Sequence, residues 1–178
     1  MIGHSMGGLV IKKAYILARR DSIYRSISDR FHTMFFIATP HRGADSAQLL
    51  FDLLRATNKG SQPYLADLGR NSVSVESIND EFRHICDRLK LYSFYETLPT
   101  TMGVKSRVIV EKDSAILGNT QERTAYINAN HRGVCKFQSP ADSNYLILRN
   151  AFASTVDDIV TNCKWAPKYH CIKGWLVC

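Results

Sequence analysis

The sequence contains no apolar run of about 18 residues, the length that a membrane-spanning helix needs, so no transmembrane segment is predicted. Its first residues lack the charged start and the apolar stretch of a secretory signal peptide. No block of five or more Lys and Arg residues occurs, although the formal net charge is +7. The absence of a basic block disfavours nucleic-acid binding and favours a mildly basic, solvated surface.

A Cys-x-x-Cys pair is also absent, and the five cysteines are an odd number. Cys163, His170, Cys171 and Cys178 lie close together in sequence but lack the spacing of zinc ligands. We therefore predict no metal site and no disulfide framework. Reduced thiols in a cytoplasmic compartment fit this cysteine usage best.

The chain does have the composition of an ordinary globular domain. Its 178 residues are 45% hydrophobic and 22% charged, which suits one domain with a real core. Periodic apolar segments continue to about residue 160 and then stop. We predict one domain over residues 1–160 and a tail outside it over residues 161–178.

The first predicted helix covers residues 9–19. Four apolar residues form its expected buried stripe at helical spacing, with the lysines largely outside it: Val10, Ala14, Leu17 and Ala18. Residues 33–38 follow as a continuous apolar run, typical of a strand that is buried on both faces of a parallel sheet. The Pro and Gly of residues 39–43 indicate a loop at the end of that strand.

The remaining segments alternate between helical and strand patterns. In order, they predict an apolar-periodic segment over 46–56, a loop over 57–63, a helix over 74–89, a strand over 91–95, a strand or hairpin return over 108–110, a strand over 125–127 and a helix over 142–160. Such alternation predicts an α/β fold, with a mainly parallel sheet and flanking helices.

Residues 3–7 read Gly-His-Ser-Met-Gly and match the Gly-x-Ser-x-Gly nucleophile elbow. In an elbow, the nucleophile sits on a strained turn between a strand and a helix, and the residues two before and two after it must be small. Ser5 is thus the candidate nucleophile. The backbone N–H of Met6 would be one oxyanion donor, supported by the N-terminus of the following helix.

Four blocks in order resemble a lipase-like α/β-hydrolase group. They are Gly-His-Ser-Met-Gly-Gly-Leu-Val-Ile-Lys-Lys-Ala from residue 3, Phe-Ile-Ala-Thr-Pro-His-Arg-Gly from residue 36, Tyr-Ser-Phe-Tyr-Glu-Thr-Leu-Pro-Thr from residue 92 and Asn-His-Arg-Gly-Val-Cys-Lys-Phe from residue 130. The group includes the serine-active-site-containing protein family and the hydrolase domains that fungi join to NACHT, tetratricopeptide or ankyrin regions. The resemblance covers about residues 1–160 and implies the C-terminal half of an α/β-hydrolase fold.

In that fold, the chain order of the triad is Ser, then Asp or Glu, then His. His131 follows a short predicted strand and lies in the block that resembles the family's histidine block. His4 is the variable residue of the elbow and is expected to pack or to line the rim. We therefore predict Ser5 and His131 as two members of the triad.

The acid of the triad has several candidates. Glu96 ends the strand over 91–95 and lies in a resembling block, so it is the first choice. Asp113 lies in a loop that could also reach the histidine and is the alternative acid. Glu111 and Glu122 stay as further candidates, whereas most carboxylates are simply exposed.

Acyl transfer through a covalent intermediate is the chemistry that a Ser-Glu/Asp-His triad predicts. Substrates would be carboxylic esters or lipid acyl esters, and no cofactor is expected. Thr39, His41 and Arg42 follow a strand end, and we expect them to bind substrate or to fix the loop of the site.

Only four residues precede Ser5, whereas the elbow of this fold normally follows the fifth strand. We expect the chain to be a fragment that lacks strands and the second oxyanion donor, and to be unstable and weakly active at best.

A second hypothesis is a non-catalytic or signalling input module of a receptor with adjoining NACHT or repeat domains. The resemblance also allows an association with mitochondria or the endoplasmic reticulum.

Overall fold

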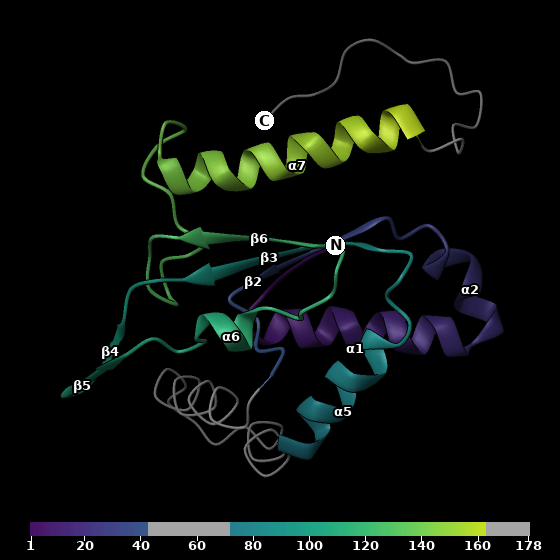
Figure 1. Ribbon diagram of the computed structural model, residues 1–178, viewed down its shortest axis with the longest axis horizontal. Helices are drawn as coiled ribbons and strands as arrows, with labels where there is room; N and C mark the ends of the chain where they lie inside the picture. Colours follow the sequence, from purple (N-terminus) through teal and green to yellow (C-terminus); the bar gives the residue numbers. More distant parts are fainter. Residues whose placement is uncertain (43–71, 163–178) are drawn as a thin grey trace.

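The computed structural model describes residues 1–42 and 72–162. These residues form a four-stranded sheet, a small hairpin and helices on both faces of the sheet (Figure 1). The strands are β1 (Ile2–His4), β2 (Thr33–Ile37), β3 (Lys90–Glu96), β4 (Thr100–Met102), β5 (Lys105–Arg107) and β6 (Glu122–Ile127). The helices are α1 (Met6–Arg20), α2 (Ser22–Ser28), α5 (Ser72–Arg83), α6 (Lys112–Ala115) and α7 (Ser143–Asn162).

The main sheet has the order β1-β2-β3-β6, and every neighbouring pair is parallel. Helices connect consecutive strands of this sheet, as parallel pairing requires. The α/β fold with a mainly parallel sheet and flanking helices is therefore confirmed. All four strands end at the same edge, and this edge carries the candidate site.

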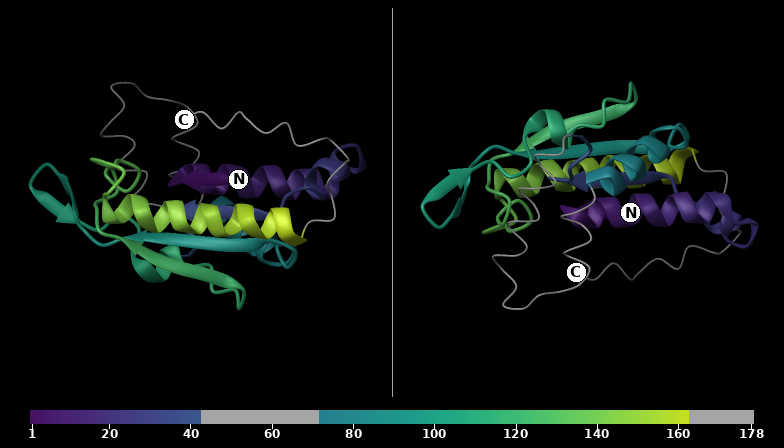
Figure 2. Two further views of the ribbon diagram at one scale, coloured as in Figure 1. Left: turned by 90° about the horizontal axis from the view of Figure 1, so that it is seen from above. Right: turned by 90° about the horizontal axis from the view of Figure 1, so that it is seen from below.

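Helices cover the two faces unequally. Among the helices of the described residues, α7 covers one face, and α1, α5 and α6 lie on the other (Figures 1 and 2). Strand β2 contacts both layers, since all five of its residues are buried. Met34 and Phe36 pack with Tyr15 and Phe82 of α1 and α5, whereas Phe35 packs edge-on against Phe152 of α7, with ring centroids 4.6 Å apart.

The predicted buried stripe of α1 is wrong. Val10 and Leu17 are exposed, and the stripe that faces the sheet is rotated around the helix. Its members are Gly8, Leu9, Lys12, Tyr15 and Ile16. The apolar pattern of α1 predicted the wrong face because Lys12 occupies the centre of the face that is buried.

Several predicted segments differ from the structure, and β6 begins three residues before the strand predicted over 125–127. The helix predicted over 74–89 ends at Arg83, because residues 84–89 continue as tight turns, with Ile85 N donating to Phe82 O and Leu89 N to Cys86 O. Residues 108–110 are not a strand, whereas β4 and β5 form the antiparallel hairpin just before them. Helices α2 and α6 were not predicted. The segments predicted over 46–56 and 57–63, and residues 163–178 of the tail predicted over 161–178, lie outside the described residues.

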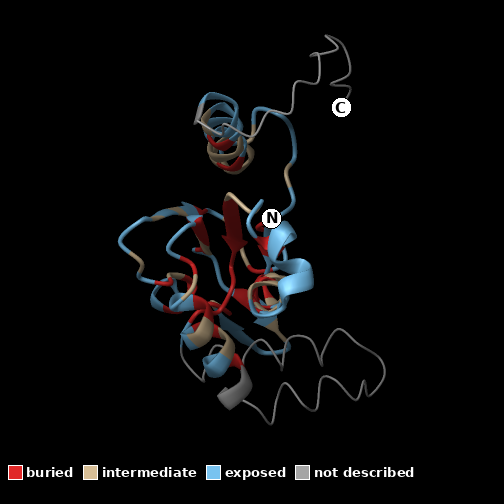
Figure 3. Ribbon diagram, turned by 90° about the vertical axis from the view of Figure 1, so that its right-hand side faces the viewer, coloured by how far each residue is buried: buried red, intermediate tan, exposed pale blue. Residues whose placement is uncertain are grey.

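Burial is greatest where the sheet meets its helices (Figure 3).

No helix in the described part of the chain is long and apolar enough to span a membrane.

Candidate active site

The carboxyl edge of the sheet carries the three residues of the predicted triad. Ser5 directly follows β1, Glu96 is the last residue of β3, and His131 lies four residues after the end of β6. Parallel strands place their carboxyl ends together, and ligands of open α/β sheets bind at that edge. Residues distant in sequence are thus brought to one place by the topology.

Ser5 occupies a strained turn between β1 and α1. Its φ of 56° and ψ of −127° lie in a region that residues with a side chain rarely adopt. The turn is held by two backbone hydrogen bonds: Ser5 N donates to Ile37 O at 2.8 Å, and Gly8 N donates to Ser5 O at 3.1 Å. A strained turn between a strand and a helix is what the predicted nucleophile elbow requires.

The glycines of the elbow are not equally crowded. A Cβ on Gly3 would lie 2.6 Å from the Gly8 backbone, and a Cβ on Gly8 would collide with the Thr39 side chain. A Cβ on Gly7 would meet no described atom within 4 Å. The prediction that the residue two after Ser5 must be small is therefore wrong for the described surroundings, and the close approach is made by Gly8 instead.

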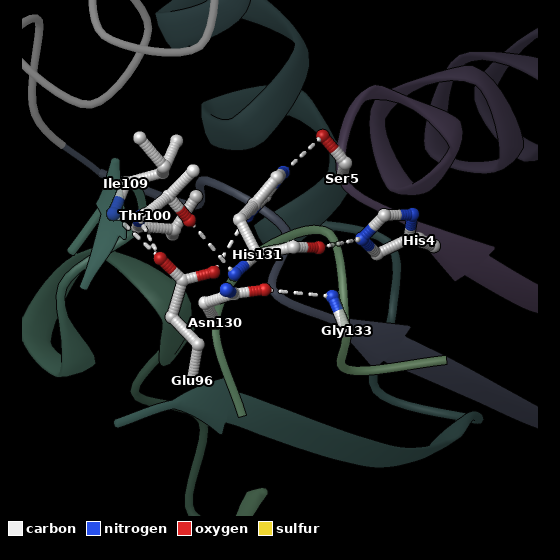
Figure 4. Close-up of polar contacts among 9 residues, drawn as sticks. His4, Ser5, Glu96, Thr100, Ile109, Asn130, His131 and Gly133 are labelled. Carbon is white, nitrogen blue, oxygen red and sulfur yellow. Dashed lines mark hydrogen bonds and ion pairs between the residues drawn. The ribbon is translucent and has the colours of Figure 1, made fainter. Parts of the chain in front are cut away.

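A chain of hydrogen bonds links the three side chains (Figure 4). Ser5 Oγ lies 2.9 Å from His131 Nε2, and His131 Nδ1 lies 2.6 Å from Glu96 Oε2. A carboxylate only accepts, so Nδ1 carries the proton and Nε2 is free to accept from the Ser5 hydroxyl. Ser5, Glu96 and His131 are 8%, 2% and 2% exposed, so the interactions are largely shielded from water.

Glu96 is fixed by the backbone as well as by His131. Its Oε1 accepts from Ile109 N at 2.5 Å and from Val110 N at 3.0 Å. Residues 108–110 do not continue the hairpin, and the N–H groups of Ile109 and Val110 point at the carboxylate instead. These two donors and His131 together hold the Glu96 carboxylate in place.

The loop of His131 is tied down at several points. His131 N donates to Thr100 Oγ1 at 3.1 Å, and Gly133 N donates to Asn130 Oδ1 at 2.9 Å. His4 Nε2 donates to the His131 carbonyl at 3.2 Å, and the two imidazole centroids lie 5.1 Å apart. Burial, and then the neighbouring His131, lower the pKa of His4, whereas the hydrogen bond to the His131 carbonyl acts in the opposite direction.

The other candidate acids lie elsewhere. Asp113 is exposed on α6, and Glu111 is exposed just before it. Glu122 accepts from Leu117 N at 2.9 Å and from Gly118 N at 2.7 Å, which fixes the turn before β6. Of the four carboxylates considered, Glu96 is the one that the structure places against His131.

Thr39, His41 and Arg42 follow β2 at the same edge, but their side chains bond to other parts of the protein and fix the loop. Thr39 and His41 are 0% and 1% exposed, so neither can touch a substrate in this conformation. Thr39 Oγ1 donates to Gly3 O at 3.4 Å. Arg42 reaches the other way and donates to Leu117 O at 2.8 Å. The packing favours loop fixation over substrate binding for these residues.

Met6 is the first residue of α1, so its N–H has no acceptor within the helix. This position beside Ser5 suits an oxyanion donor, and the positive end of the helix dipole adds to it. The catalytic role of Met6 stays a prediction.

Lys12 and its partner Asn79 were missed from the sequence. Lys12 is fully buried, and its Nζ contacts His41 Nδ1 and lies 2.7 Å from Asn79 Oδ1. Desolvation by burial lowers the pKa of Lys12 to about 7. Its spacing of four residues from Gly8 could have indicated the true buried face of α1.

No group of three or more His, Cys, Asp and Glu residues in the described ranges could hold a metal ion. An open hollow on the surface is lined by the first residues of β3 and β6 and by the turn before β6. It therefore lies at the opposite edge of the sheet from Ser5.

Comparison with curated proteins places this chain among relatives of two kinds. Protein SERAC1 of Bos taurus is 28% identical over 145 residues, which are 76% of this chain and 20% of that protein. Protein SERAC1 of Danio rerio is 30% identical over 145 residues, again 76% of this chain and 20% of that protein. Ankyrin repeat domain-containing protein SAT10 of Stachybotrys chartarum is 26% identical over 180 residues, 90% of this chain and 9% of that protein.

The chain spans about a fifth of the length of the SERAC1 proteins that it matches. No family model matches it, and no solved structure matches it. The homologues agree with the predicted resemblance to the serine-active-site-containing proteins and to ankyrin-linked fungal domains. Membership of a wider lipase-like group and a link to NACHT domains stay predictions.

Proposed function

We propose that this chain carries the reactive residues of a serine hydrolase that cleaves carboxylic esters or lipid acyl esters. One observation carries the proposal: Ser5, His131 and Glu96 form a continuous hydrogen-bonded relay at the carboxyl edge of a parallel sheet. The strained backbone of Ser5 supports it further, because strain at a nucleophile is a recurrent feature of elbows.

In the proposed mechanism, Ser5 Oγ attacks the ester carbonyl while its proton passes to His131 Nε2. Glu96 keeps Nδ1 protonated and stabilises the imidazolium that forms. The N–H of Met6 donates to the oxyanion of the tetrahedral intermediate. The alcohol then leaves with the proton from His131, and water repeats the sequence to release the acid from Ser5.

Hydrolysis of p-nitrophenyl esters with short and long acyl chains tests this proposal. The chain should release p-nitrophenol slowly but faster than buffer alone, and Ser5→Ala should lose most of this excess rate. Ser106→Ala, at an exposed serine of β5, is the matched control. Equal rates for Ser5→Ala and the unaltered chain would overturn the proposal.

A second candidate is a signalling input module in a protein with repeat domains. The observation that favours it is the similarity to an ankyrin repeat domain-containing protein over 90% of this chain. Sequencing the transcript on both sides of this chain tests it. An in-frame P-loop or ankyrin repeat would support the module, and a Ser5→Ala protein that still signals would show that the chemistry is dispensable.

A further inference from the structure

Lys12 is an unusual residue for the centre of a buried helix face. Its side chain is fully buried, and Nζ lies 5.0 Å and 5.3 Å from the ring centroids of Phe36 and Phe82. No carboxylate forms an ion pair with it among residues 1–42 and 72–162. Burying a lysine without a counter-ion is costly, so its presence requires a gain elsewhere.

The acceptors of Lys12 belong to the loop that follows β2 and to α5. Nζ donates to His41 Nδ1 and to Asn79 Oδ1, and Asn79 Nδ2 donates to Pro40 O at 3.3 Å. Lys12 therefore holds two successive loop residues, one directly and one through Asn79. Because Nδ1 accepts, the proton of His41 sits on Nε2, a buried atom without a hydrogen-bond partner among the described residues.

The same loop packs on the elbow. The Thr39 side chain fills the space beside Gly8, and its hydroxyl donates to Gly3 O. The strand residue just before the loop, Ile37, accepts from Ser5 N. A displacement of the loop would therefore move the backbone on both sides of Ser5.

We propose that Lys12 is a positioning residue of the serine site: its hydrogen bonds to His41 and Asn79 hold the loop after β2 against the elbow and keep Ser5 Oγ within reach of His131. The inference rests on the proposed hydrolase function. Both the ammonium and the neutral amine have at least two N–H groups, so the link persists on either side of neutral pH. A misplacement of about 1 Å at a reacting atom can cost about 10²-fold in rate.

Three variants test the role of Lys12. Lys12→Met keeps the volume but removes the donors, Lys12→Gln keeps two donors, and Lys13→Met changes the neighbouring, partly exposed lysine as the matched control. Each is reacted with a fluorophosphonate, and the saturating rate is separated from the half-saturating concentration. We expect Lys12→Met to slow the saturating rate about 10–100-fold with half-saturation unchanged, Lys12→Gln to recover most of it, and Lys13→Met to match the unaltered chain.

Several results would overturn the inference. They are an unchanged rate in Lys12→Met, no recovery in Lys12→Gln, or the loss of cooperative melting in both variants, which would make Lys12 a residue of stability alone. If the unaltered chain itself is not labelled at Ser5, the proposed hydrolase function fails instead. Amide hydrogen exchange then tests the link: Lys12→Met must speed exchange at Ser5 and His41, and Lys13→Met must not.

Discussion

Glu96→Gln should abolish most of the activity of this site while leaving its architecture in place. The amide oxygen can still accept from Ile109 N and Val110 N, as Oε1 does now. The amide NH₂ must then face His131 Nδ1, where Oε2 accepts now. His131 would become the tautomer protonated on Nε2, which donates to Ser5 and cannot take its proton.

The size of this effect follows from the geometry. In serine proteases, the same loss of tautomer control with the packing intact costs about 10⁴ in rate, and we expect a loss of about 10³–10⁴ here. Glu96→Ala should be slow as well, and it should also unfold more easily. It leaves two buried N–H groups without an acceptor, at about 1–3 kcal/mol each.

The assay is ester hydrolysis beside urea denaturation of the same preparations. We expect Glu96→Gln to keep nearly the denaturation midpoint of the unaltered chain, and Glu96→Ala to lose several kcal/mol of unfolding free energy at most. Asp113→Asn should hydrolyse ester within about twofold of the unaltered rate, because Asp113 is exposed on α6. A Glu96→Gln protein that hydrolyses ester at the full rate, or an inactive Asp113→Asn protein, would refute the assignment of the acid.

Two further predictions concern stability. Gly3→Ala should destabilise the chain by about 1–3 kcal/mol, because the new Cβ would meet the Gly8 backbone. Gly7→Ala places its Cβ in open space at a helical position, so it should be neutral or stabilising by up to about 1 kcal/mol. Urea denaturation midpoints measure both effects, and an equal loss of stability in the two variants would contradict the packing. Lys12→Met should change how stability depends on pH. Burial lowers the pKa of Lys12 from 10.5 to about 7, so between these values the unfolded chain binds the extra proton, and the stability of the unaltered chain rises with pH by up to about 1.4 kcal/mol per pH unit. In Lys12→Met the free energy of unfolding should lack this rise with pH. If the free energy of unfolding depends on pH in the same way for both proteins from pH 7 to 10, the buried Lys12 does not have the lowered pKa.

Much of the fold could be predicted from short-range pattern. The continuous apolar run of β2 indicated burial on two faces, and the elbow residues indicated the strained turn at Ser5. The order of strands and helices was sufficient to predict the parallel sheet. The predicted bounds of β6 were too short, because its residues at 122–124 carry no apolar pattern.

What sequence could not supply is the set of contacts made by polar groups inside the fold. Nothing local to Lys12 says that His41 and Asn79 will meet it, because those partners come from a loop and another helix. The choice between Glu96 and Asp113 had the same difficulty. It depends on where residues 108–110 turn their N–H groups, and that direction is decided by tertiary packing.

Whether Ser5 is a nucleophile activated by His131 decides the function proposed for this site. The most direct test is reaction of the folded chain with a fluorophosphonate probe, followed by mass spectrometry of the labelled peptide. We expect one adduct on Ser5, which is lost in Ser5→Ala, slowed strongly in His131→Ala and retained in Ser106→Ala. Equal labelling of the unaltered chain and Ser5→Ala, or no adduct on a cooperatively folded chain, would contradict this role of Ser5.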